Sequence, residues 1–185
     1  MARIRRAGKL ILTGIAVAAV TVVAAGLYFF QPWKLWQDET VVESLPSPAA
    51  TLPAEPASPG ESPVAPTSPL TVAAGKFISH EHTTTGVVKI VRLADGTHTL
   101  RLENLDTSNG PDLHVWLTDA PVKEGRGGWG VFDDGKYVSL GKLKGNKGNQ
   151  NYVLPADAEL SDYTSVSVWC ARFGVSFGAA ELTQV

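Results

Sequence analysis

Cys170 is the only cysteine in the 185-residue chain, and its thiol is the group best suited to redox or nucleophilic chemistry. It ends an apolar run, Ser165–Cys170. If this run is a β-strand, the period of two places the thiol on the same face as Val166 and Val168 and puts Trp169 on the opposite face. We therefore expect the thiol to point inward.

A thiol among valines has two interpretations. It can be inert packing, because free cysteine is among the most buried residue types and burial raises its pKa. It can also be reactive if a cation lies close, and Arg172 is expected to share the face of Cys170. Covalent catalysis would further need a base within reach, and no spacing places His98 or His114 there. Enzyme activity stays open, and the sequence favours a protein that is not a stand-alone enzyme.

Histidines supply a second, weaker candidate site. His80 and His82 would share a face in an extended segment, and Asp112 with His114 has the same spacing. Together they offer nitrogen and oxygen ligands for zinc or copper. Surface histidines are ordinary in such a chain, and no histidine or methionine follows Cys170 to complete a blue-copper site. We predict no cofactor and keep His80 and His82 as weak metal candidates.

The N-terminal region predicts a membrane anchor. Residues 1–9 are basic, and residues 10–30 form an uncharged stretch of 21 positions. As a helix that stretch spans roughly 30 Å, enough for the hydrocarbon core of a bilayer. The positive-inside rule then places the N-terminus in the cytoplasm and the C-terminal part outside a cell membrane crossed once. A cleaved signal peptide is the alternative, although its apolar region is usually only about 7 to 15 residues.

Residues 31–70 predict a disordered stalk. Eight of the twelve prolines fall between Pro46 and Pro69, among serine, alanine, threonine and glutamate. Such a segment buries too little apolar surface to fold, and its prolines favour an extended chain that would reach on the order of 90 Å. A proline-rich ligand for a partner domain is the alternative.

Residues 71–185 predict a small all-β domain. Short apolar runs are separated by turn-forming clusters such as Asp95–Gly96 and Ser108–Pro111, and no run of ten residues keeps a helical period. Seven or eight strands in about 115 residues point to an antiparallel sandwich or barrel. Eleven basic and thirteen acidic residues are interspersed here, which argues against a nucleic-acid partner. The glycine-rich stretch Gly125–Phe132 is expected to be a hairpin tip.

Four ordered blocks of this domain carry a family resemblance. They are Leu100–Asn104, Thr107–Leu117, Leu140–Gly145 with Gln150–Tyr152, and Val168–Phe173 with Phe177–Ala180. In this combination they resemble the DM13 domain, from about Gly75 to Leu182.

The resemblance implies a small β-sandwich-like extracytoplasmic domain, which in other proteins occurs alone or beside DOMON and cytochrome b561-type modules. It also implies a proposed electron-transfer role through the characteristic cysteine, here Cys170. Asn109, Asp112, His114, Trp169 and Arg172 lie in the same blocks and are the expected supporting residues. No haem-binding bundle is recognised in the chain, so an extracytoplasmic redox partner would be another molecule.

Two functions follow. The first is a membrane-anchored extracytoplasmic domain with a redox role centred on Cys170. The second is a non-catalytic binding or structural module of the envelope in which Cys170 is core packing. A redox thiol should react with a maleimide in the native state, whereas a core thiol should stay silent until denaturation.

Overall fold

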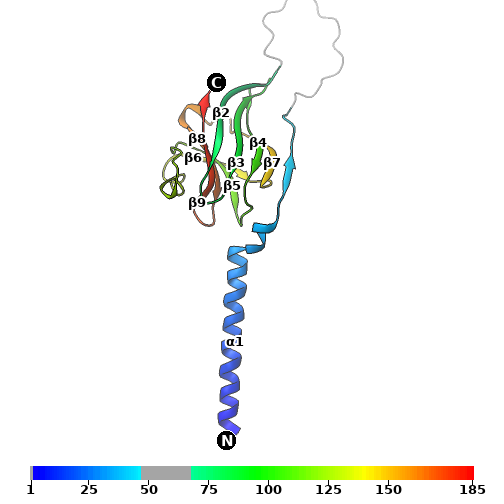
Figure 1. The fold of residues 1–185 in the computed structure, drawn as a ribbon, viewed down its shortest axis with the longest axis vertical. Coiled ribbons are helices and arrows are strands. Elements are labelled where there is room, and N and C mark those ends of the chain that lie inside the picture. The colour runs from blue at the N-terminus through cyan, green and yellow to red at the C-terminus, as the bar shows by residue number, and fades with distance from the viewer. Residues whose placement is uncertain (1, 47–67) are drawn as a thin grey trace, which may run out of the picture.

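The computed structural model describes residues 2–46 and 68–185, with only the backbone course given for residues 2–11, and consists of one long helix followed by a β domain (Figure 1). The elements are α1 (Ala2–Phe30), η1 (Pro32–Trp36), β1 (Thr40–Val42), β2 (Leu70–Ser79), β3 (Thr85–Arg92), β4 (His98–Asp106), β5 (Leu113–Thr118), η2 (Arg126–Gly128), β6 (Tyr137–Lys142), β7 (Lys147–Val153), η3 (Leu160–Asp162), β8 (Ser165–Cys170), β9 (Val175–Glu181) and β10 (Thr183–Gln184).

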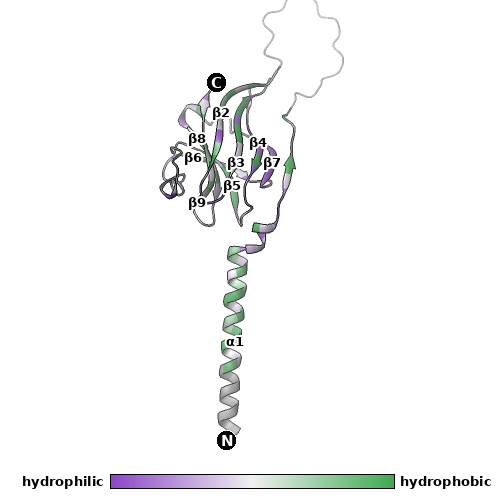
Figure 2. Ribbon diagram, in the orientation of Figure 1, coloured by the Kyte–Doolittle hydropathy of each residue, from purple (hydrophilic) through white to green (hydrophobic). Residues whose placement is uncertain are grey.

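Helix α1 extends away from the β domain and is largely apolar along its described length (Figure 2). Residues Leu12–Phe30 are long and apolar enough to cross a membrane, and no part of the described protein buries them. The helix ends where Gln31 adopts a left-handed backbone conformation and Pro32 follows, a combination that commonly terminates helices. The expected anchor helix is therefore present as a candidate membrane span.

The β domain is one curled sheet of mixed direction rather than a purely antiparallel sandwich. The strand order is β1-β7-β4-β3-β2-β9-β8-β5-β6, and β10 pairs with β2 off this path. The first part of β2 pairs with β3 and its last part pairs with β9, so this strand joins the two halves of the curl. A Cβ atom at Gly75, at the join, would run into the backbone oxygen of Glu181. Glycine is needed at this corner.

The prediction of an all-β domain is confirmed, and the purely antiparallel arrangement is corrected at one edge. There β1 runs parallel to β7, with Val41 opposite Gly148. The backbone N–H of Glu43 donates to the carbonyl of Asn149 at 2.9 Å, and that of Lys147 donates to the carbonyl of Glu39 at 3.1 Å. The segment before β2 thus adds a strand to the free edge of the sheet.

Strand β1 lies within the segment that was predicted to be a disordered stalk, residues 31–70. Residues 31–46 contain η1 and β1, whereas the stalk was expected to be disordered from residue 31 onward. Glycines on β7 and the preceding turn permit the docking, because a Cβ at Gly148 would meet the backbone of Val41. The proline-rich remainder, residues 47–67, lies outside the described residues.

Two apolar clusters hold the domain together. The larger fills the inside of the curl with residues from strands of both halves, including Val88, Leu102, Val115, Val168 and Phe177. The smaller lies on the outer face of the β5–β8–β9 half and is built on Trp116, Phe132 and Trp169. The loop between β5 and β6 supplies Phe132, so β8 is buried on both faces.

Candidate functional site

Cys170 is the last residue of β8, opposite Leu113 of β5 and Val175 of β9. Its side chain is 0 % exposed and belongs to the inner cluster with Val166 and Val168. Trp169 belongs to the outer cluster. The alternation of faces expected from the sequence is therefore confirmed.

The surroundings of Cys170 act on its pKa in opposite directions. Burial raises the pKa of the thiol most strongly, while the backbone N–H groups of Phe173, Arg172 and Asp112 lower it and the charge of Glu81 raises it; the net effect is a raised pKa. The turn after β8 wraps the end of the strand, with the N–H of Phe173 donating to the carbonyl of Cys170 at 3.2 Å. At neutral pH the group is a protonated thiol inside the protein.

The side chain of Arg172 is directed to α1. Its Nη1 donates to the carbonyls of Tyr28 at 3.1 Å and Phe29 at 2.9 Å, and its guanidinium lies 5.5 Å from the centre of the Phe29 ring. The last carbonyls of a helix lack intrahelical partners and carry a partial negative charge, so a cation there is favourable. Arg172 thus fastens the helix to the domain, and its backbone N–H rather than its guanidinium acts on Cys170.

Trp169 stands at one end of an aromatic stack that reaches the surface. Its ring centre is 5.0 Å from that of Trp116, which in turn lies 4.1 Å from the nearly parallel ring of Tyr137. Phe132 packs edge-on against Trp169 at 6.2 Å. Tyr137 is 45 % exposed, so the stack connects a buried ring beside Cys170 to the surface at strand β6.

Sequence reasoning missed this stack. Its signal lies in strand pairing, because Trp116 is paired with Ser167 and is therefore the diagonal neighbour of Trp169. The pairing partner of a strand has to be known before such a neighbour can be named.

Asp112 and His114 lie together at the start of β5. His114 Nε2 is 3.1 Å from Asp112 Oδ1, and Lys142 Nζ is 3.4 Å from the same oxygen. Burial opposes ionisation of Asp112, but the hydrogen bond from His114 and the nearby lysine hold the pKa of this carboxyl below its usual value. Asn109 lies in the preceding turn and donates from Nδ2 to the carbonyl of Gln37 at 3.3 Å. This cluster borders the thiol through the backbone of Asp112.

His80 and His82 take different partners. His80 is buried, with Nδ1 2.9 Å from Ser176 Oγ and Nε2 3.1 Å from the carbonyl of Lys123, which fixes the proton on Nε2. The ring of His82 instead packs on that of Phe177, with centres 3.9 Å apart. Burial lowers the pKa of both rings. Among the residues the structure describes, no three histidine, cysteine, aspartate or glutamate side chains gather as metal ligands would.

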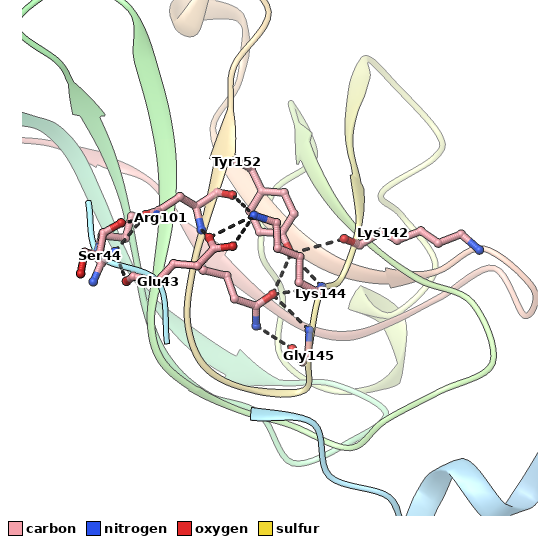
Figure 3. A network of polar contacts seen from close by, with 9 residues as sticks. Glu43, Ser44, Arg101, Lys142, Lys144, Gly145 and Tyr152 are labelled. Atoms are coloured by element: carbon pink, nitrogen blue, oxygen red, sulfur yellow. Dashed lines mark hydrogen bonds and ion pairs between the residues drawn. The ribbon is translucent and has the colours of Figure 1, made fainter. Parts of the chain in front are cut away.

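A polar network fixes β1 to the domain (Figure 3). Both carboxylate oxygens of Glu43 contact Lys144 Nζ, at 2.7 and 3.0 Å, and one also accepts the backbone N–H of Asn151 at 2.7 Å. Arg101 donates from Nη1 to the carbonyl of Glu43 at 3.1 Å. The hydroxyl of Tyr152 lies beneath this network and accepts the N–H of Lys144 at 3.1 Å. The segment between helix and domain is therefore held along the sheet edge.

These features define a small all-β domain that carries one enclosed thiol and is joined to an apolar helix. Residues 76–182 match the protein-family model described as "Electron transfer DM13", which covers more than half of the chain. The protein belongs to the DM13 family. Neither the curated proteins nor the solved structures contain a match.

Proposed function

We propose that this protein is a membrane-anchored extracytoplasmic electron-transfer domain in which Cys170 is the redox-active group. The observation that carries the proposal is the family assignment together with the position of Cys170 at the strand end, enclosed by the turn from Ala171 to Gly174. The apolar helix and the basic residues before it support placement of the domain outside the cytoplasm.

Burial decides which chemistry such a thiol supports. Nucleophilic attack needs a thiolate in contact with its target, and Cys170 is fully buried with a raised pKa. Electron transfer needs no direct contact: the thiol would give one electron to an oxidised partner protein and release its proton to solvent, which leaves a thiyl radical at Cys170. The stack formed by Trp169, Trp116 and Tyr137 leads from the neighbour of Cys170 to the surface, so it offers a route to a partner protein that docks at β6.

The proposal is tested by counting oxidising equivalents. The full chain in lipid nanodiscs is titrated anaerobically with a one-electron oxidant, and the wild type is compared with Cys170→Ala. Wild type should consume about one equivalent more than the variant. Val168→Ala is the matched control, because it truncates a buried residue on the same strand face but keeps the thiol. Equal consumption by wild type and Cys170→Ala contradicts the proposal.

A second function is supported by a specific observation. Cys170 packs in the same cluster as Leu113 and Phe177, as an ordinary core residue would. In a binding or structural module of the envelope, Cys170→Ala would change stability and nothing else. The titration above separates the two functions.

A further inference from the structure

A pocket of about 270 Å³ lies where the helix meets the β domain. One side is formed by the end of α1 and by η1, including Phe30 and Leu35. The other side is formed by Phe173 and Phe177 of the domain. The ring of Phe30 stacks on that of Phe173, with centres 5.6 Å apart, so the helix and the domain share an aromatic wall.

The position of the pocket indicates where its ligand comes from. Phe30 is the last residue of the candidate membrane span, so the pocket opens at the level where the helix leaves the apolar layer. Leu35 and Trp36 are exposed beside it, and tryptophan favours the boundary between lipid and water. In a protein anchored by this helix, a ligand dissolved in the membrane would lie next to the pocket.

The lining indicates a flat ring with polar oxygens. The walls are largely aromatic and apolar, and the polar side chains that line the pocket are those of Gln31, Lys34, His82 and Asn109. His82 Nε2 is 3.9 Å from the Glu81 carboxylate, which is too long for a hydrogen bond, so this ring is available to a ligand. The volume lies just below the range of roughly 300 to 1,000 Å³ that holds drug-sized ligands. One or two fused rings fit it.

The pocket also borders the candidate redox residue. Phe177 packs in the same cluster as Cys170, and Phe173 donates its N–H to the carbonyl of Cys170. A ligand that contacts Phe173 and Phe177 therefore touches the turn after Cys170 and the apolar cluster that contains the thiol.

We propose that this pocket binds the ring of a membrane quinone. The ring lies among Phe30, Phe173 and Phe177, and its carbonyl oxygens accept hydrogen bonds from the His82 ring and the Asn109 amide. The isoprenoid tail extends along α1 into the lipid. The choice of a quinone rests on the proposed electron-transfer function, whereas the existence of a membrane-facing aromatic site rests on the pocket itself.

Binding is measured with the full chain in phosphatidylcholine nanodiscs. The probe is 2-methyl-1,4-naphthoquinone, and 2-methylnaphthalene is the matched compound without carbonyl oxygens. Calorimetric titration should show saturable binding of the quinone at least tenfold tighter than that of the hydrocarbon. His82→Leu should remove this difference while the hydrocarbon still binds. Leu35→Trp should fill the pocket and weaken both compounds, and it stands in if His82→Leu fails to fold.

His98→Leu is the control, since His98 lines a different cavity with residues of the β3–β4 turn. It should leave quinone binding unchanged. Equal affinities for the two compounds, or no saturable binding, overturn the inference. Displacement of the bound quinone in a titration with phosphatidylcholine alone also overturns it, because the pocket would then bind lipid.

Cys170→Ala separates this inference from the proposed function. It should bind the quinone as tightly as wild type, because the thiol does not line the pocket. Quinone binding with no effect of Cys170→Ala on oxidising equivalents refutes the redox role and leaves the site standing. If the wild type consumes one oxidising equivalent more than Cys170→Ala but no quinone binds, the quinone site is refuted and the redox role of Cys170 stands.

Discussion

Glu43 fastens β1 to the β domain, and we expect Glu43→Ala to loosen this strand without unfolding the sheet. The side chain pairs with Lys144 and accepts the backbone N–H of Asn151. Strand β1 has only three residues, and Glu43, directly after it, adds these side-chain contacts to the backbone hydrogen bonds at the sheet edge. The sheet behind it has its own core and does not depend on the strand.

The magnitude follows from the two contacts. An exposed ion pair such as Glu43–Lys144 contributes about 0.2 to 1 kcal/mol. A hydrogen bond to a charged group contributes about 1.5 to 3 kcal/mol, and water replaces part of this at a sheet edge. We therefore expect a loss of about 1 to 2 kcal/mol in the local stability of β1. That corresponds to a 5- to 30-fold increase in the opening of the strand.

Hydrogen exchange measures this opening directly. The amide of Glu43 donates to Asn149, and the amide of Lys147 donates to Glu39, so peptides carrying these two amides should exchange faster in the variant. Peptides from β8 should not change. Glu124→Ala is the control, because Glu124 is exposed on the loop between β5 and β6. An unchanged rate in β1, or an equal rise in the control, would show that the carboxylate does not hold the strand.

Cys170→Ala should lower the free energy of unfolding by about 1 to 2 kcal/mol, and Cys170→Ser should lower it by about 1 to 3 kcal/mol. The fall in Tm should therefore be smaller for alanine than for serine. The opposite order would mean that the serine hydroxyl finds a hydrogen-bond partner. Burial raises the pKa of Tyr152 from 10.0 to about 12, so the folded state favours the neutral phenol. The stabilisation that Tyr152 gives the folded state is complete below pH 10 and is lost as the pH rises from 10 to 12. Tyr152→Phe should therefore remove that part of the fall in Tm at alkaline pH. Protease added to intact cells should remove the β domain. A protected domain would refute its placement outside the cell, and a soluble form trimmed near Ala25 would refute the membrane anchor.

The sequence alone determined the helix, the β domain and the direction of the thiol. An uncharged run of 21 residues has few structural solutions, because its length and composition suit a membrane span. The alternation in Ser165–Cys170 assigned Cys170 and Trp169 to opposite faces, since the period of a strand depends only on local geometry. The ordered motif blocks were sufficient to indicate the family that the matched residues 76–182 then established.

The direction of Arg172 was decided by tertiary structure. In a continued strand this residue would share the face of Cys170, but β8 ends at Cys170 and the chain turns. The guanidinium then meets the carbonyls at the end of α1, more than 140 positions earlier in the chain. No local pattern reports such a contact.

Tertiary structure also decided the docking of β1, the aromatic stack and the pocket at the end of α1. Strand β1 is too short to be predicted from its own residues, and it forms because β7 presents a free edge with glycines that permit close approach. Trp116 and Trp169 meet through strand pairing, and the pocket forms only where η1 crosses the turns of the domain. Each depends on which distant backbone lies alongside, and a strand sequence specifies its faces far better than it specifies its neighbours.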